Sequence, residues 1–185
     1  MSVPSNYLSD DKLLWEAFKQ GDRLAFRQII ATYYTSLFRF GSRYSKNSAF
    51  VEDCLHDLFV YLWDRRQYVG PTNSIRKYLF TSFRHKLLLE LQRTHRRGWV
   101  DEEEAQDIAP DQTIEDFFVY IETEQLSAQK IKCLIDLLPQ RQQEALYLRY
   151  YESMDIDQIA HVMNINRQSV SNHLHKALSF LRESW

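Results

Sequence analysis

The sequence has few of the residues that build turns, disulfides or membrane spans. Its 185 residues include only 4 Gly, 4 Pro and 2 Cys. Because Gly and Pro mark turns, their scarcity beside a 44% hydrophobic content predicts a folded chain of helices with few turns. Cys54 and Cys133 belong to no CxxC pair, which gives no indication of a disulfide framework or a zinc site. No apolar run approaches the ~18 residues of a membrane span and no signal peptide opens the chain, so we expect a cytoplasmic protein.

Catalytic patterns are also missing from the sequence. No nucleophile, general base and oxyanion donor assemble into a recognisable set. The dipeptide His56-Asp57 resembles a fragment of a metal hydrolase, but no second His cluster at ligand spacing accompanies it. We therefore expect no enzyme activity, no metal, no cofactor and no small-molecule substrate.

The net charge of -2 conceals three blocks of different sign. Residues 1–97 carry 16 Lys and Arg against 9 Asp and Glu, whereas residues 98–129 carry 10 acidic residues and no Lys or Arg. Residues 130–185 are nearly balanced, with 7 basic and 6 acidic residues. The segment 99–112, which ends in DEEEAQDIAPDQ, has the composition of a flexible acidic tether between two folded parts.

Residues 152–183 predict two helices joined by a tight turn. Asp155 is expected to cap the first helix, and Gln158 three residues later completes a capping-box pattern. Asn166 can cap the second helix, while Asn164 in the turn tolerates a left-handed backbone. The apolar spacing fits two helices that cross steeply, as in a helix-turn-helix.

The second of these helices combines an apolar stripe with a polar face. The stripe consists of Val170, Leu174, Ala177, Leu178 and Leu181. The polar face carries side chains that can hydrogen-bond to base edges and phosphates, namely Gln168, Ser171, Asn172, His175, Lys176 and Ser179. The alternative is an ordinary amphipathic helix whose polar face is merely solvated, and the pattern favours the helix-turn-helix over it.

A helix expected over residues 48–63 has a buried stripe and an acidic face. The stripe comprises Val51, Cys54, Leu55, Leu58 and Leu62. The other face mixes acidic and apolar residues, namely Asp53, His56, Asp57, Val60, Tyr61 and Asp64. That mixture favours docking onto a basic protein surface over simple solvation.

A basic helix with interleaved aromatics is expected to follow over residues 74–97. It carries seven Lys and Arg residues, and Glu90 is its only acid. We expect the core-facing residues to be Ile75, Tyr78, Leu79 and Phe83, and the more exposed ones to be Phe80, Thr81, Arg84 and His85. Cations beside aromatics suit single-stranded DNA, because charges follow phosphates while rings stack on bases at ~1–3 kcal/mol each. The alternative is a basic solvated helix whose aromatic rings all lie in the core.

In their order and spacing these segments resemble the extracytoplasmic-function sigma factors of bacterial RNA polymerase, over nearly the whole chain. VEDCLHDLFVYLW resembles the first characteristic segment of that family, with Asp53, Asp57, Phe59 and Trp63 matching. KYLFTSFRHKLLLELQR resembles the second, although His85 stands where the family usually has Asn. LPQRQQEALYLRYYESMDIDQIAHVM followed by RQSVSNHLHKAL resembles the third, which contains the helix-turn-helix.

The resemblance implies an all-α protein of two small helical domains joined by an acidic flexible linker. Residues 1–98 would form sigma domain two, 99–112 the linker, and 113–185 sigma domain four with its helix-turn-helix. The implied function is to select promoters for core RNA polymerase. The implied partners are core RNA polymerase, promoter DNA and an anti-sigma factor, which in this family is often anchored in the membrane.

The resemblance also gives roles to three sets of residues. Core polymerase would be bound through Asp53, Asp57, Leu58, Val60 and Tyr61. The minus-ten element would be met by Lys77, Phe80, Thr81, Arg84, His85 and Lys86. The minus-thirty-five element would be read by Arg167, Gln168, Ser171, Asn172, His175 and Lys176. Because His85 replaces the usual Asn, we expect an altered minus-ten preference.

Two other functions fit parts of the sequence. A LuxR-type transcriptional regulator is the nearest, since residues 138–174 also resemble the carboxyl-terminal module of that family. It leaves residues 48–97 without a role, and no strand pattern of a receiver domain precedes the module. A helical protein-interaction adaptor without any DNA-binding role is the more distant alternative.

Overall fold

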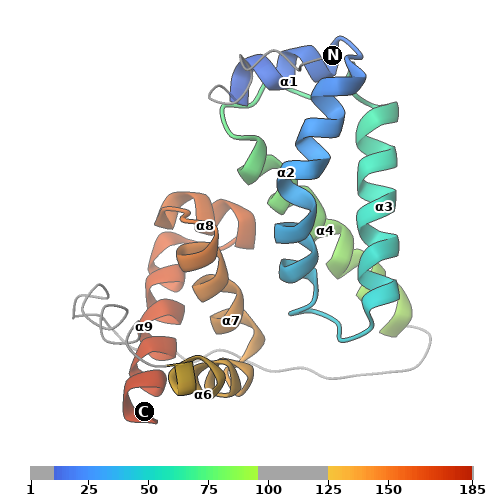
Figure 1. Cartoon of the computed structure of the whole chain (residues 1–185). Helices are drawn as coiled ribbons and strands as arrows, with labels where there is room; N and C mark the ends of the chain where they lie inside the picture. The colour runs from blue at the N-terminus through green and yellow to red at the C-terminus, as the bar shows by residue number, and fades with distance from the viewer. Residues whose placement is uncertain (1–10, 96–124, 185) are drawn as a thin grey trace. The chain divides into compact units, whose positions relative to one another are not determined.

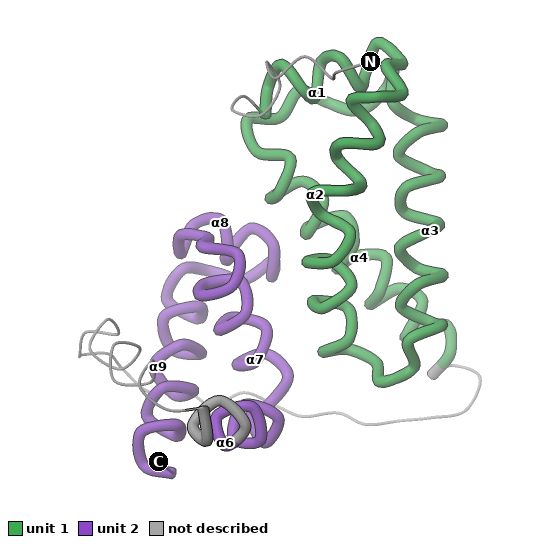
Figure 2. The backbone as a smooth tube through the Cα atoms, in the orientation of Figure 1, with its two compact units in different colours: residues 1–100 green, residues 101–185 purple. Residues whose placement is uncertain are grey.

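The computed structural model describes residues 11–95 and 125–184. Every regular element in these two ranges is helical, which confirms the predicted all-α fold (Figure 1). The chain divides into two compact units, residues 1–100 and 101–185 (Figure 2). The acidic tether of residues 99–112 lies outside the described residues. No helix in the described ranges is long and apolar enough to cross a membrane.

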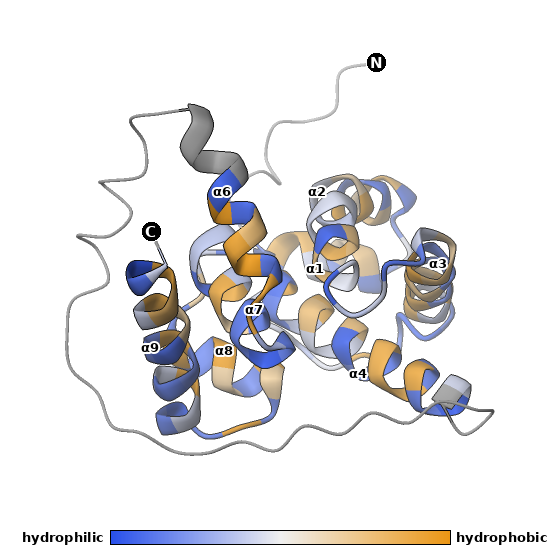
Figure 3. Ribbon diagram, turned by 90° about the horizontal axis from the view of Figure 1, so that it is seen from below, coloured by the Kyte–Doolittle hydropathy of each residue, from blue (hydrophilic) through white to orange (hydrophobic). Residues whose placement is uncertain are grey.

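The first unit contains four described helices. They are α1 (Asp11–Lys19), α2 (Arg23–Gly41), α3 (Ser48–Asp64) and α4 (Ile75–His95). The helices α2, α3 and α4 pack against one another, and α1 contacts α2 and α4 (Figure 1). In Figure 3 hydrophobic and hydrophilic residues alternate along these helices, as expected of amphipathic helices around a shared core.

The helix ends of this unit follow largely from local sequence. Gly21 follows α1 with a positive φ of 90°, a conformation that glycine adopts readily at the end of a helix. Asp22 then caps α2, because its Oδ1 accepts hydrogen bonds from the Leu24 and Ala25 amides at 2.7 and 3.3 Å. The first residue of α4 is capped from a distance, since the Ile75 amide donates to Asp11 Oδ2 at 2.9 Å.

Aromatic rings fill the core of the first unit. Its fully buried aromatic side chains are Trp15, Phe18, Phe40, Phe80 and Phe83. The ring centroids of Trp15 on α1 and Tyr78 on α4 lie 4.9 Å apart, and those of Phe40 on α2 and Phe80 on α4 lie 5.2 Å apart at 73°. Such pairs add about 0.5–1.5 kcal/mol beyond the area they bury. The core therefore holds α1, α2 and α4 together through ring contacts.

The second unit is built around its last helix. Its described elements are α6 (Gln125–Asp136), α7 (Gln140–Leu146), the π-helical turn η2 (Tyr147–Tyr151), α8 (Ile156–Met163) and α9 (Arg167–Glu183). The helices α6, α7 and α8 all contact α9. Three helices thus pack against the apolar stripe of α9 and leave its other face polar.

The helix that follows Pro139 changes its period in its second half. Its α-helical part ends at Leu146, and a π-helical turn follows. In that wider turn the Tyr147 and Tyr151 rings stack, with centroids 5.2 Å apart and planes at 15°. A π turn is not visible in an apolar pattern, because it changes the helix period for one turn only.

Candidate nucleic-acid interface

The helix-turn-helix predicted for residues 152–183 is present, with the expected caps. Asp155 Oδ1 accepts from the Gln158 amide at 2.8 Å, and Gln158 Oε1 accepts from the Asp155 amide at 3.0 Å, which completes the capping box. Asn166 Oδ1 accepts from the Ser169 amide at 2.7 Å and so caps α9. Asn164 adopts the left-handed conformation, with φ 54° and ψ 48°. Local side-chain chemistry therefore fixes both helix starts and the turn between them.

All five residues of the predicted apolar stripe on α9 are buried. The six residues assigned to the minus-thirty-five element lie off this stripe. Arg167 and Gln168 are exposed, and Ser171, Asn172, His175 and Lys176 are partly exposed. The structure thus brings these six together on one face of one helix.

Two contacts organise the start of this polar face. Gln168 Nε2 donates to Asn172 Oδ1 at 3.1 Å, which orients two amides that could each meet a base edge. Arg167 Nε lies 3.1 Å from Asp157 Oδ1 on α8, and their side chains are 72% and 65% exposed. An ion pair this exposed is worth ~0–1 kcal/mol, so another anion can replace Asp157 at little cost.

His173 lies beside the polar face but is not a source of charge for it. Burial lowers the pKa of His173 below its usual 6.5, and the nearby positive charges of Arg141 and Lys176 lower it further. At neutral pH this imidazole is therefore neutral, and Lys176 and Arg167 are the cations on the polar face of α9.

We expect acid to destabilise the second unit through His173. The unfolded chain binds the proton at a higher pH than the folded one, so stability is lost as the pH falls below about 6.5. His173→Asn should flatten the dependence of the thermal midpoint on pH between about 7 and 5, relative to the unmodified chain. Parallel curves for the two proteins would contradict this prediction.

The α4 helix places the predicted minus-ten residues on different faces, and two expectations about it are wrong. Phe80 is 0% exposed and Arg84 only 6%, although both were expected to face solvent. The reason is that α4 packs against α1, α2 and α3 together. Its buried positions from Ile75 to Leu87 cover roughly 180° of the helix at 100° per residue, a wider arc than a surface helix has.

The remaining members of the minus-ten set are accessible. His85 is exposed, and Lys77, Thr81 and Lys86 are partly exposed. Thr81 Oγ1 donates to the Lys77 carbonyl at 2.7 Å, which holds the hydroxyl against the helix backbone. The accessible face of α4 is therefore cationic and polar rather than aromatic.

Of the five predicted polymerase-binding residues on α3, four are exposed and one is buried. Asp53 and Asp57 are exposed, and the exposed fractions of Val60 and Tyr61 are 47% and 61%. Leu58 is only 5% exposed and belongs to the core stripe that the sequence also predicted. Four of the five residues thus form a surface on which acids and apolar groups stand side by side.

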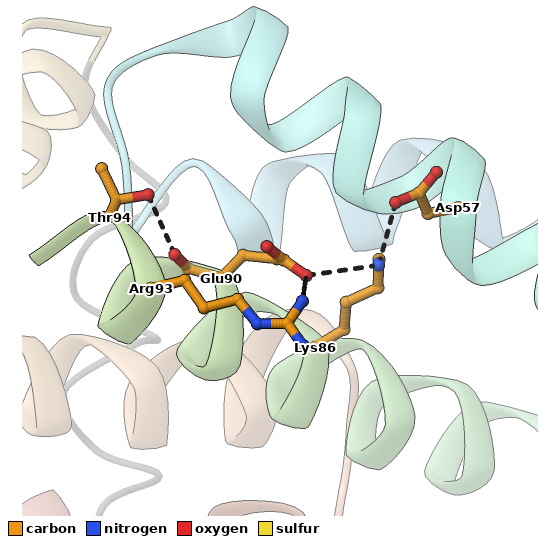
Figure 4. Close-up of polar contacts among 5 residues, drawn as sticks. All are labelled: Asp57, Lys86, Glu90, Arg93 and Thr94. Carbon is orange, nitrogen blue, oxygen red and sulfur yellow. Dashed lines mark hydrogen bonds and ion pairs between the residues drawn. The ribbon is translucent and has the colours of Figure 1, made fainter. Parts of the chain in front are cut away.

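One ion-pair network joins this α3 surface to α4 (Figure 4). Lys86 Nζ lies 3.0 Å from Asp57 Oδ2 and 3.8 Å from Glu90 Oε1. Arg93 Nη1 donates to the same Glu90 oxygen at 2.8 Å. Sequence reasoning missed Glu90 and Arg93, although the spacing of Lys86, Glu90 and Arg93 by four and three residues is a visible signal for pairing on a helix.

Cys54 lies near these charged side chains, but its thiol is unreactive. Burial, the largest cause, raises the pKa of its thiol to about 11, and the charges of Glu90 and Asp57 raise it while that of Lys86 lowers it. The thiol therefore stays protonated near neutral pH, and a protonated buried thiol is a poor nucleophile and a poor metal ligand. Within residues 11–95 and 125–184, no three His, Cys, Asp or Glu side chains group closely enough to hold a metal ion.

The segment that contains the helix-turn-helix matches a known protein family. Residues 128–181 match the family described as sigma-70, region 4. Comparison with curated proteins gives no significant match.

Two solved structures share the fold over most of the chain. CnrH, solved in complex with the cytosolic domain of CnrY, is 17% identical, with a TM-score of 0.62 over 94% of this chain and 95% of that one. The sigma factor RpoE from Bartonella quintana, solved with the anti-sigma factor NepR, is 18% identical, with a TM-score of 0.63 over 86% of this chain and 95% of that one.

The family match covers the helix-turn-helix, and the structural matches cover both units. The family match confirms the resemblance of the third sequence segment, and the structural matches show a shared fold for the rest of the chain. The chain thus contains a segment, residues 128–181, that matches sigma-70 region 4, and it shares its fold with these two solved structures.

Proposed function

We propose that the protein binds core RNA polymerase and directs transcription initiation at a dedicated set of promoters. The observation that carries this proposal is the polar face of α9, which lies inside the segment matching sigma-70 region 4. No covalent chemistry is needed for this role. Phosphate contacts supply salt-dependent affinity, and contacts to base edges supply the choice of sequence.

In this proposal α9 enters the major groove of the minus-thirty-five element. Arg167 and Lys176 neutralise phosphates, while Gln168 and Asn172 meet base edges with the amide groups that their mutual hydrogen bond orients. Ser171 and His175 lie on the same face and complete the contact surface. Each well-made bidentate contact to a base contributes ~1–3 kcal/mol of discrimination.

The first unit serves the minus-ten element and the polymerase through two neighbouring helices. On α4 the DNA-facing groups are Lys77, Thr81, His85 and Lys86, and the buried Phe80 and Arg84 support that surface from beneath instead of touching bases. On α3 the acidic and apolar residues Asp53, Asp57, Val60 and Tyr61 dock onto core polymerase, with Leu58 fixing them from the core.

An anti-sigma factor is the regulatory partner that fits this proposal. Of the two solved relatives, RpoE was solved with the anti-sigma factor NepR, and CnrH with the cytosolic domain of CnrY. A protein that covers the exposed residues of α3 would block access to core polymerase without changing the fold.

Run-off transcription tests the proposal directly. The protein is added to bacterial core polymerase lacking any sigma factor, on a library of upstream regions from the source genome. Discrete transcripts that depend on the protein are expected, and their aligned upstream sequences give both promoter elements. The Gln168→Ala, Asn172→Ala double variant is the matched control, because it should still bind core polymerase but lose selectivity at the minus-thirty-five position.

Another pattern of results would favour the alternative function. A LuxR-type regulator would bind a duplex operator as a dimer without polymerase and would give no core-dependent transcripts. Absence of both transcripts and core binding would therefore overturn the proposal.

A further inference from the structure

Lys86 connects two surfaces to which the proposed function gives different partners. It lies on α4, among the residues proposed to meet DNA, yet its ammonium is 3.0 Å from Asp57 Oδ2 on α3 (Figure 4). Asp57 belongs to the surface proposed to meet core polymerase. The Lys86 side chain is 24% exposed and that of Asp57 is 62% exposed. A cation of an incoming protein can therefore reach Asp57 more easily than a phosphate can reach Lys86.

The charges around Lys86 are balanced in the isolated chain. Two carboxylates, Asp57 and Glu90, stand against two cations, Lys86 and Arg93. Glu90 is engaged on its own helix by Arg93 at 2.8 Å and lies 3.8 Å from Lys86, so Asp57 is the nearer carboxylate to Lys86. Asp57 is also the only member of this network that comes from α3. Neutralising Asp57 alone would leave the α4 surface with one additional uncompensated positive charge.

We propose that Asp57 is a positioning residue that withholds Lys86 from DNA in the isolated chain and releases it when core polymerase engages α3. This inference rests on the proposed function of the two helices. An incoming cation from polymerase competes for the Asp57 carboxylate, and Lys86 then becomes available to a phosphate of the minus-ten region. Binding of polymerase and binding of DNA are thereby coupled through one ion pair, and the coupling is reciprocal.

The expected size of this coupling follows from the exposure of the pair. A solvent-exposed ion pair changes an equilibrium by about two- to five-fold and is weakened by salt. The effect is therefore small enough for both helices to keep their packing when the pair breaks. It is large enough to measure in a double-mutant cycle at low ionic strength.

The test measures binding of the full-length chain to a short fluorescein-labelled single strand of DNA at low salt. Asp57→Asn should tighten this binding about two- to five-fold in the isolated chain. Lys86→Gln should weaken it, and Asp57→Asn should give no gain in the Lys86→Gln background. In the complex with saturating core polymerase, Asp57→Asn should no longer tighten DNA binding, because polymerase already occupies the carboxylate.

Glu52→Gln is the matched control, since Glu52 is an exposed acid on the same helix and changes the net charge equally. If Asp57→Asn and Glu52→Gln have equal effects on DNA binding, the inference is wrong and the pair only joins α3 to α4. In that case the unmodified chain would still support transcription with core polymerase, so the proposed function would stand. An unmodified chain that binds neither DNA nor core polymerase would overturn both.

Discussion

Phe80→Ala is expected to lower the free energy of unfolding of the first unit by about 3–5 kcal/mol, the cost of removing a buried aromatic ring. Phe80 is 0% exposed, and its ring lies 5.2 Å from that of Phe40 on α2. The resulting cavity would lie in the core that α4 shares with α2. Under the proposed function, loss of core-polymerase binding and of transcription initiation should follow from unfolding, because α3 and α4 would lose their common support.

Hydrogen exchange of peptides from residues 11–95 measures this effect without interference from the second unit. Protection of α2 and α4 should fall sharply in Phe80→Ala, while peptides of α8 and α9 keep theirs. Tyr68→Ala is the control, since Tyr68 is 79% exposed and its removal should change stability by no more than about 0.5 kcal/mol. Unchanged protection together with defective promoter melting would mean that Phe80 leaves the core to stack on a base.

The features that sequence analysis predicted correctly depend on short-range chemistry. The capping box of Asp155 and Gln158, the cap by Asn166 and the left-handed Asn164 each involve groups within about four residues of one another. The same holds for the apolar stripe of α9, because every third or fourth residue of a helix returns to the same face. These features determine where the polar face of α9 points, so the candidate minus-thirty-five surface could be predicted from the sequence.

The features that it missed depend on contacts between distant parts of the chain. Basic and aromatic residues are spread around α4, so the sequence could not tell how much of the helix other helices cover. Phe80 and Arg84 were placed on the surface for that reason, whereas packing against three helices buries both. The cap of α4 by Asp11, 64 residues before Ile75, is equally invisible in local sequence.

The ion pair of Asp57 with Lys86 also depends on a contact between distant parts of the chain. The resemblance gave these two residues separate partners, polymerase and DNA, and nothing in the motifs placed them 3.0 Å apart. The packing of the helices decides whether two charged side chains of different helices form an ion pair. The roles of single residues in the first unit therefore needed the structure more than those in the helix-turn-helix did.

Gly41→Ala is expected to destabilise the first unit by about 1–3 kcal/mol through overpacking. Gly41 is the last residue of α2 and is buried. A Cβ atom there would lie 2.6 Å from Val51 Cγ1 on α3 and 3.0 Å from Phe83 Cε1 on α4, so both neighbours would have to move. The better helix propensity of alanine offsets at most about 1 kcal/mol of this cost. Three helices meet at this glycine, and the shift would disturb the relative position of α3 and α4.

Gly70→Ala provides the matched comparison, because no atom lies within 4 Å of the Cβ position at Gly70. The Gly70 carbonyl that accepts from Trp15 Nε1 at 3.0 Å is a backbone group and survives the substitution. Urea unfolding of both full-length variants, followed by far-ultraviolet circular dichroism, should show a lower midpoint for Gly41→Ala only. Under the proposed function, affinity for core polymerase should fall in that variant alone, since α3 carries the proposed polymerase-binding residues Asp57 and Tyr61 and packs against Gly41 through Val51. Equal midpoints would mean that Val51 and Phe83 can move aside without cost, and that the close approach of the three helices is not what fixes α3.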